Sequence, residues 1–348
     1  MNAKRLSGAE IEATYNPAEE IQHLRDEVSD LRARLAAQRK ETGKARVDAL
    51  ALTEAIESAQ PEKLVYRPGK LDKSSPVTCV LHLTDLHNGE ITEKDEVDGF
   101  GEFSPEIFTR RLQQLGENIL KFVAVQRTGY SIPHLHVLAT GDYVSGDIHE
   151  ELRVTNAYPT PVQAVRCGYD LGALGAMLAP HFETVTWDMI TSDNHGRMTR
   201  KNQAAEGGQN NWGYVVAHVV RQHLAEHGNV RVNIHAKPSA VVPIGSERYL
   251  MFHGHEIKGW AGLPYYGFDR RAAMEAVKRM NVPDAAFTKM VFGHFHTAVS
   301  TLLYNSGGSL SGTNAFDHSC GRHARAHQTS WLVHPEHGEY AFCRWWLS

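Results

Sequence analysis

The sequence lacks the features that mark membrane, secreted and disulfide-rich proteins. It has no hydrophobic run of the roughly 18–20 residues needed to span a bilayer. Residues 1–20 contain no apolar segment of the kind found in secretory signals. Only four of the 348 residues are cysteine, and no two of them form a C-x-x-C pair. This usage fits a reducing compartment better than a disulfide framework, so we expect a cytoplasmic protein with no membrane partner.

An excess of positive charge is also missing. The 36 Lys and Arg residues against 40 Asp and Glu give a formal net charge of −4, which argues against a broad basic surface for nucleic acids. A nuclease whose positive charge comes from bound metal ions would still be compatible. The residue in unusual supply is histidine, with 21 copies. Because histidine is the commonest metal ligand, this abundance prompts a search for a metal site, with scattered surface histidines as the alternative.

Residues 1–75 differ from the rest of the chain and predict a charged helical extension. Apolar side chains recur there in steps of three and four, as on one face of a coiled coil: Ile21, Leu24, Val28, Leu31 and Leu35. We expect Gly43 to interrupt this helix, a second helical stretch over residues 44–59, and a linker over residues 67–76. The stripe indicates either a short coiled coil that forms a homo-oligomer or a helix packed on its own main domain.

Residues 76–348 predict one α/β domain, because strand-like and helix-like segments alternate along them. The expected strands are residues 77–83, 134–139, 184–191, 230–235, 239–243, 249–253 and 289–292. The expected helices are residues 104–126, 161–178, 211–227 and 269–280. Ser104 is the expected N-cap of the first of these helices, with Pro105 at its first position.

Five of the expected strands end in side chains that can bind metal. They are followed by Asp85 and His87, by Asp142, by Asn194 and His195, by His253 and His255, and by His294 and His296. Polar clusters just past strand ends are where α/β folds build their sites. Asp and Asn also favour turns, and a lone histidine is usually a surface residue. Five such strand ends together nevertheless favour one shared metal site.

The mixture of donors indicates the chemistry of such a site. Carboxylate, amide and imidazole groups together suit cations such as Mn²⁺, Fe²⁺ or Zn²⁺, and no thiolate accompanies them. A carboxylate has two oxygens, so one Asp can bridge two ions. Two ions about 3.5 to 4 Å apart can share a hydroxide nucleophile and hold the oxygens of a phosphoryl group during in-line displacement.

These motifs follow the order found in the calcineurin-like metallophosphoesterase superfamily, which the chain resembles from about Val77 to the C-terminus. The motifs are Asp85-x-His87, Gly141-Asp142, Asn194-His195, His253-Gly254-His255 and Gly293-His294-x-His296. The resemblance implies a four-layer αββα sandwich that holds two divalent metal ions. We expect Mn²⁺, with Fe²⁺, Zn²⁺, Mg²⁺ and Ni²⁺ as alternatives.

The resemblance also implies a role for each motif residue. One metal would bind Asp85, His87 and His296, the other would bind Asn194, His253 and His294, and Asp142 would bridge them. His195 would protonate the leaving oxygen or stabilise the transition state, without binding metal. The chain departs from the family pattern at Asp193, where Gly is usual. Either Asp193 adopts the left-handed backbone that Asp tolerates, or its carboxylate lies near the metals. His255 is the alternative to His253.

The resemblance implies hydrolysis of phosphate esters. The run from Asn194 to Lys201 resembles phage and prophage members similar to DNA-repair exonucleases, so we expect a DNA phosphodiesterase, in the host cytoplasm if a phage encodes it. Arg197, Arg200 and Lys201 would then contact the DNA backbone, with His255 on the substrate side. The alternatives are a phosphomonoesterase or nucleotidase, a protein phosphatase, and a non-catalytic scaffold.

Overall fold

The computed structural model describes residues 17–59, 75–199, 207–258, 262–321 and 323–348. Backbone contacts divide the chain into two units, Met1–Gly69 and Lys70–Ser348. Among the described helices, none is both long and apolar enough to cross a membrane. The linker expected over residues 67–76 lies almost wholly outside the described ranges.

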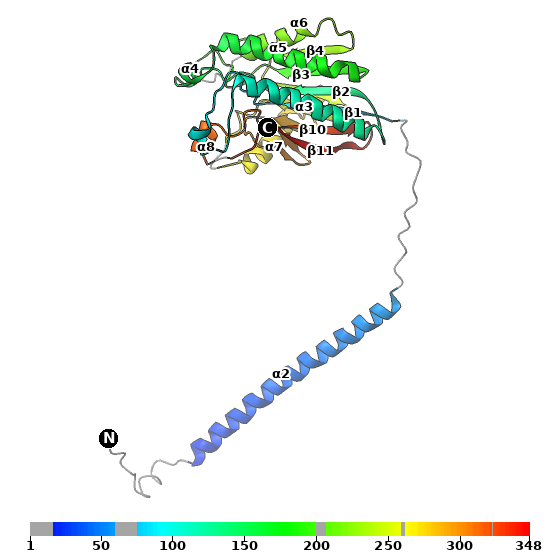
Figure 1. Ribbon diagram of the computed structural model, residues 1–348. Helices are drawn as coiled ribbons and strands as arrows, with labels where there is room; N and C mark the ends of the chain where they lie inside the picture. Colours follow the sequence, from blue (N-terminus) through cyan, green and yellow to red (C-terminus); the bar gives the residue numbers. More distant parts are fainter. Residues whose placement is uncertain (1–16, 60–74, 200–206, 259–261, 322) are drawn as a thin grey trace, which may run out of the picture. The chain divides into compact units, whose positions relative to one another are not determined.

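The first unit contains one long helix, α2 (Pro17–Ser58; blue in Figure 1), and every residue on it is exposed. The expectation that Gly43 interrupts the helix was wrong, because the helix runs through this residue. A glycine inside a helix costs only about 1 kcal/mol relative to alanine. Exposed pairs such as Arg34 with Asp30 (2.8 Å) lie along the same helix. The two expected helical stretches are therefore one element of 42 residues.

The second unit contains two β-sheets, of which the larger is mostly parallel. Its six strands lie in the order β11-β10-β1-β2-β3-β4. Their bounds are β1 Pro76–Leu83, β2 Ser131–Ala139, β3 Thr184–Ile190, β4 Val230–His235, β10 His327–His334 and β11 Gly338–Trp346. Strands β1 to β4 are parallel neighbours, whereas β10 is antiparallel to both β1 and β11. The carboxyl ends of β1 to β4 therefore meet at one edge.

The smaller sheet has five strands in the order β5-β6-β7-β9-β8. Their bounds are β5 Ser239–Ile244, β6 Glu247–Phe252, β7 Lys289–Phe292, β8 Val299–Ser300 and β9 Tyr304–Ser306. Strands β6, β7 and β9 are parallel, and the outer strands β5 and β8 are antiparallel to their neighbours. This sheet too has parallel strands whose carboxyl ends lie together.

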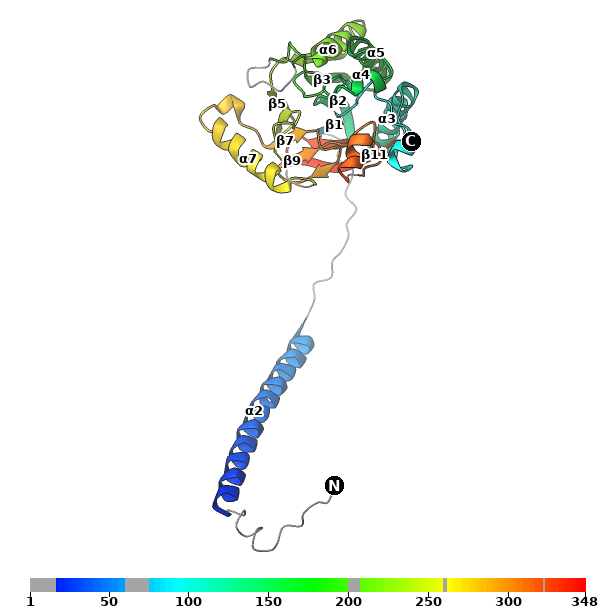
Figure 2. The same cartoon turned by 90° about the vertical axis from the view of Figure 1, so that its left-hand side faces the viewer.

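Helices cover the outer faces of both sheets (Figure 2). On the larger sheet these helices are α3 (Pro105–Gln126), α5 (Thr160–Leu178) and α6 (Trp212–His223), which share one buried apolar cluster with its strands. Helix α7 (Tyr265–Arg279) covers the smaller sheet through Phe268. The remaining short elements are α4 Leu152–Thr155, α8 Ala315–Ser319 and the 3-10 turns η1 Lys94–Val97, η2 Ala179–His181 and η3 Pro283–Ala285.

The inner faces of the two sheets pack against each other. Val80 and Leu138 of the larger sheet share a buried apolar cluster with Tyr249 and Val291 of the smaller one. Apolar burial of this kind contributes about 25 cal/mol per Å² of surface removed from water. The four-layer αββα arrangement expected for residues 76–348 is confirmed.

A local sequence signal explains where helix α3 begins. Helix α3 starts at Pro105 as expected, and Ser104 Oγ accepts a hydrogen bond from the backbone N–H of Ile107 (3.3 Å). Helix α6 ends at His223, earlier than expected, because the chain has to turn there into β4. Asn229 stabilises this turn by donating to the backbone oxygens of Ala179 (2.8 Å) and Phe182 (2.9 Å).

Candidate metal centre

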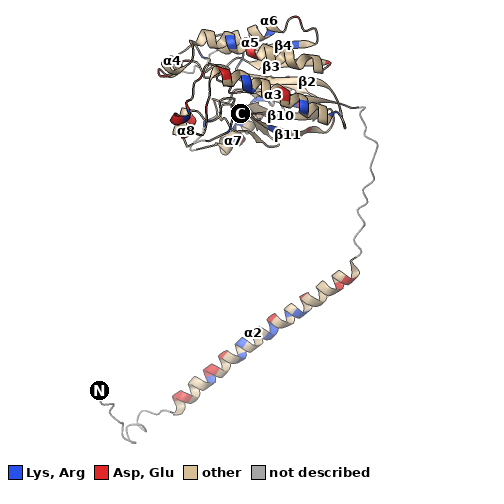
Figure 3. Cartoon of the chain, in the orientation of Figure 1, with Lys and Arg blue, Asp and Glu red and all other residues tan. Residues whose placement is uncertain are grey.

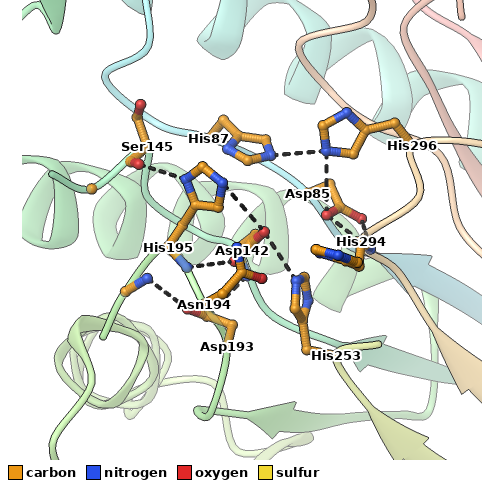
Figure 4. Close-up of polar contacts among 12 residues, drawn as sticks. Asp85, His87, Asp142, Ser145, Asp193, Asn194, His195, His253, His294 and His296 are labelled. Carbon is orange, nitrogen blue, oxygen red and sulfur yellow. Dashed lines mark hydrogen bonds and ion pairs between the residues drawn. The ribbon is translucent and has the colours of Figure 1, made fainter. Parts of the chain in front are cut away.

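The side chains that follow five strands converge on one place in the second unit (Figure 4). The strands and the residues after them are β1 with Asp85 and His87, β2 with Asp142, β3 with Asn194 and His195, β6 with His253, and β7 with His294 and His296. Three of these strands belong to the larger sheet and two to the smaller one. The candidate centre therefore lies where the parallel strand ends of both sheets meet.

One group of donors consists of Asp85, His87 and His296. One ligand atom from each lies within 4.8 Å of the others. Nε2 of His296 lies 3.2 Å from Nε2 of His87 and 3.6 Å from Oδ1 of Asp85. Two imidazole nitrogens this close share either a proton or a cation. This is the set that the resemblance assigned to the first metal.

A second group consists of Asp142, His253 and His294, again with ligand atoms within 4.8 Å of one another. Nε2 of His253 lies 3.0 Å from Oδ2 of Asp142. Asn194 completes the expected set, since its Oδ1 is buried and accepts no hydrogen bond from the described residues. A buried amide oxygen without a partner is costly unless something else binds it, and a cation satisfies that requirement.

His253, and not His255, belongs to this group. The His255 ring centroid lies 5.6 Å from that of His253 and 6.4 Å from that of His294. Its Nδ1 lies 4.0 Å from a carboxylate oxygen of Glu256. The structure thus places His255 beside His253 and outside the groups of close donors.

Asp142 belongs to the second group and also lies close to His87 of the first. It also forms a third set of close donors with His87 and His195. Its Oδ1 accepts a hydrogen bond from the backbone N–H of His195 (3.1 Å), while its Oδ2 faces His253 and lies 4.0 Å from Nε2 of His195. A carboxylate in this position can contact two ions at once.

Three of the histidine rings are oriented by an acceptor at Nδ1. The acceptors are Thr140 O for His253 (3.0 Å), Ser145 O for His195 (2.7 Å) and Asp317 Oδ2 for His296 (2.6 Å). An Nδ1–H donated in this way leaves Nε2 as the nitrogen that faces the centre. For His296 the partner is a carboxylate, the arrangement that orients a histidine ligand and strengthens its basicity.

Sequence reasoning missed Asp317 as a residue of the site. A weak local signal was present, because Asn314 caps the short helix α8 by accepting from the backbone N–H of Asp317 (2.8 Å). That signal predicts where a helix starts, but it does not predict that Asp317 contacts His296. Only the tertiary structure brings the two side chains together.

The backbone is strained at the candidate ligands. Seven described non-glycine residues have positive φ, and five of them are the donors Asp85, His87, Asp142, His294 and His296. This conformation costs roughly 1–2 kcal/mol for each residue, and such strain gathers at functional sites. Gly293 is required here, because a Cβ at this position would overlap the side chains of Thr84 and Asp85.

Asp193 builds the turn before the Asn-His pair. Its Oδ2 accepts from the backbone N–H of Asp142 (2.9 Å), and its Oδ1 accepts from that of Gly196 (2.6 Å). Asp193 is not among the residues with positive φ, so the expectation of a left-handed backbone was wrong. The alternative is the one observed, with the carboxylate beside Asp142. Burial and the neighbouring Asp142 raise the pKa of Asp193 to about 6.

The electrostatics of the centre favour an added positive charge. Burial alone would raise the pKa of Asp142, but His253 and His195 outweigh it and hold the pKa well below its ordinary value. Burial lowers the pKa of His87 and His294, so both keep a free lone pair. Burial opposes protonation of His253 as well, yet Asp142 raises its pKa to about 10.

A cavity of about 470 Å³ opens beside the donors. Its wall includes His195 and the acidic residues Glu90, Glu96, Glu151 and Asp317. The described residues that line it include no lysine or arginine. Its volume lies within the roughly 300–1,000 Å³ of ordinary ligand pockets.

Only one of the three basic residues expected to contact substrate, Arg197, belongs to the described part of the chain. The Arg197 guanidinium donates to the backbone oxygens of Asn194 (2.6 Å) and Thr199 (3.2 Å), and Arg197 is not among the residues that line the cavity. Arg200 and Lys201 lie outside the described residues. The substrate roles of all three stay predictions.

Comparisons with known proteins add little to this geometry. No family model and no curated protein matches the sequence. Solved structures that match include Vps29 from Cryptosporidium parvum, with 12% identity over 78% of this chain and 98% of that chain and a TM-score of 0.32. Zinc-complexed Vps29 from Entamoeba histolytica matches with 13% identity over 78% of this chain and 99% of that chain, with a TM-score of 0.26. A predicted phosphoesterase from Streptococcus pneumoniae matches with 10% identity over 78% of this chain and 98% of that chain, with a TM-score of 0.29. At such low values the functional proposal rests on the geometry of the site.

Proposed function

We propose that the chain is a metal-dependent phosphoric ester hydrolase of the calcineurin-like metallophosphoesterase superfamily. The observation that carries the proposal is the position of Asp142, which has a carboxylate oxygen within 4.8 Å of a ring nitrogen of His87 and one within 4.8 Å of ring nitrogens of His253 and His294. One group supplies Asp85, His87 and His296, and the other supplies Asn194, His253 and His294. When bound, two divalent cations supply an activated water and stabilise charge on the phosphoryl oxygens.

The protein's own residues account for orientation and proton transfer. Asp142 and the surrounding imidazoles would hold the cations, and Asp317 and Thr140 orient the rings of His296 and His253. His195 lines the cavity with 21% of its side chain exposed, against 1% for His87. Its Nδ1 is bound to Ser145 O, so its Nε2 is the atom that donates a proton to the leaving oxygen.

Two classes of substrate are candidates for this site, DNA and a small phosphate ester. DNA is the substrate expected from the sequence, with Arg197, Arg200 and Lys201 along its backbone. The cavity supports the alternative, a small phosphate ester, because its wall carries four acidic residues besides Asp142 and its described lining has no lysine or arginine. Away from the metal ions, such a wall favours a compact neutral or cationic leaving group over a long polyanion.

Elemental analysis of the purified full chain, followed by a substrate panel with Mn²⁺, tests both parts. The panel contains single-stranded and double-stranded DNA, a nucleoside monophosphate, a phosphopeptide and a small phosphodiester. We expect hydrolysis of at least one of them. Absence of bound metal, or no hydrolysis of any ester with metal bound, would refute the enzyme assignment. Cleavage of DNA alone would refute the small-ester alternative.

His195→Ala tests the proton-donor role against a matched control. General acid–base catalysis contributes about 10²- to 10⁴-fold, so activity should fall by that factor while metal content stays the same. The control is His337→Ala, which changes an exposed histidine on the turn between β10 and β11. Equal activity in both variants would contradict the assigned role of His195.

A further inference from the structure

The continuous helix α2 carries a longer apolar stripe than the sequence suggested. Because Gly43 does not break the helix, the steps of three and four that begin at Ile21 continue without a shift to Leu52 and Ile56. The positions on this face are Ile21, Leu24, Val28, Leu31, Leu35, Gln38, Thr42, Ala45, Ala49, Leu52 and Ile56. Its large aliphatic members are 46–67% exposed. A stripe of this length marks an interaction surface.

Charged residues of both signs lie along α2 (Figure 3), and their heptad positions separate them by sign. In heptad notation, with Ile21 at position a, the four e positions from residue 25 to residue 46 are all arginine: Arg25, Arg32, Arg39 and Arg46. The g positions from residue 20 to residue 48 are Glu20, Glu27, Arg34, Glu41 and Asp48. One flank of the stripe is thus basic, and the other is acidic except at Arg34.

We propose that α2 forms a parallel, in-register, two-stranded coiled coil with a second copy of this chain. In a parallel pair each g residue faces the e residue of the next heptad on the partner helix. Glu20 then meets Arg25 of the other copy, Glu27 meets Arg32, and Glu41 meets Arg46. An antiparallel pair would instead set arginine against arginine along one flank.

The apolar positions agree with two strands in this orientation. Ile21 and Val28 are β-branched and lie at a, while Leu24 and Leu31 lie at d, the combination that favours parallel dimers. The polar residues Gln38 and Thr42 occupy the middle of the stripe. In register, each of them meets its own counterpart, whereas a shift by one heptad would place it against an aliphatic or alanine layer. Polar layers of this kind fix register at some cost in stability.

The one unfavourable g position is partly compensated within the helix. Arg34 would face Arg39 of the other copy, but its Nε lies 2.8 Å from Oδ2 of Asp30 on the same helix. A parallel dimer lets both chains leave the coiled coil at the same end, after Ser58. The proposal does not depend on the phosphoesterase assignment.

Sedimentation analysis of the full-length chain at micromolar concentration tests the assembly. We expect twice the mass of one chain, Leu31→Asp to give a monomer, and the matched Leu50→Asp to stay dimeric. Leu50 is as apolar as Leu31 and similarly exposed (63% against 55%), but it lies at position b, off the stripe. A monomeric full-length chain, a trimer or tetramer, or a dimer that survives Leu31→Asp would overturn the proposal.

Two further experiments test orientation and register. Glu27→Arg and Arg32→Glu should each weaken the dimer, and the double variant should restore it, since the pair is only inverted. Leu24→Cys should form an intermolecular disulfide under mild oxidation. Leu50→Cys should give no more disulfide-linked dimer than the unchanged chain forms through its native cysteines. No rescue, or no cross-link at Leu24→Cys in a dimeric sample, would overturn the parallel arrangement.

Discussion

Replacing Asp317 by Asn should weaken metal binding while leaving the fold intact. Asp317 Oδ2 lies 2.6 Å from Nδ1 of His296. Burial lowers the pKa of His296, but the Asp317 carboxylate is the main group that opposes this effect, and the pKa is raised to about 10. Asparagine keeps an acceptor oxygen of nearly the same shape but loses the charge. The backbone contact between Asn314 and residue 317 is unaffected by this change.

The expected loss of metal affinity follows from the contact of Asp317 with His296, a candidate metal ligand. Loss of such a partner typically costs 10- to 100-fold in metal affinity or activity, which corresponds to about 1.4 to 2.8 kcal/mol. Competition of the full chain with a chromophoric chelator during Mn²⁺ titration measures this loss. Only the site that contains His296 should weaken, so one of two binding steps should shift.

A matched control lies on the protein surface. Oδ2 of Asp98 lies 3.0 Å from Nε2 of His318, so Asp98→Asn makes the same chemical change at an exposed pair. This variant should bind Mn²⁺ as the unchanged chain does. If Asp317→Asn also bound Mn²⁺ with unchanged affinity and melted at the same temperature, the assignment of His296 as an oriented ligand would be refuted.

Three other predictions follow from named contacts. Gly293→Ala should abolish metal binding, because the added Cβ would overlap a carboxylate oxygen of Asp85. Gly43→Ala adds a Cβ that meets no other atom, so it should raise the helix content measured by circular dichroism. Burial would raise the pKa of Asp188, but hydrogen bonds from His136 and His235 (2.6 Å each) lower it. Its stabilising contribution is therefore present above the unfolded value of about 3.9 and is lost as the pH falls toward the folded-state value. In denaturant titrations the destabilisation by Asp188→Asn should shrink below about pH 3.9, and a constant difference would contradict this. Chelation should abolish hydrolysis and lower the melting temperature in calorimetry, since ligands that bind only the folded state stabilise it; an unchanged melting temperature would contradict a metal-loaded native state.

The strand ends of the candidate centre could be predicted because their signals are local. A β-branched or apolar run followed by Asp85, Asp142 or His294 indicates a strand and the polar turn after it. Parallel strands then bring such turns to one edge without any knowledge of the contacts. The N-cap at Ser104 was predictable for the same reason, since the bond to Ile107 spans only three residues.

Features that depend on contacts across the chain could not be predicted in this way. Asp317 orients His296 from 21 residues away, and Asp193 supports the backbone of Asp142 from 51 residues away. Neither separation along the chain corresponds to the repeat of a helix or a strand, so no sequence pattern indicates the contact. The choice between His253 and His255 is of the same kind, because both follow one strand and only packing decides which ring meets Asp142.

The sequence by itself therefore determined the order of elements, the donor types and the apolar face of the N-terminal helix, since each depends on residues a few positions apart. The tertiary structure alone decided which donors face Asp142, which partners orient their rings, and what lines the cavity beside them. Those outcomes depend on how two sheets pack, and packing is set by the sum of many weak contacts between distant residues. The unbroken course of α2 through Gly43 belongs with them, because it reflects the balance of a whole helix against the small penalty of one residue.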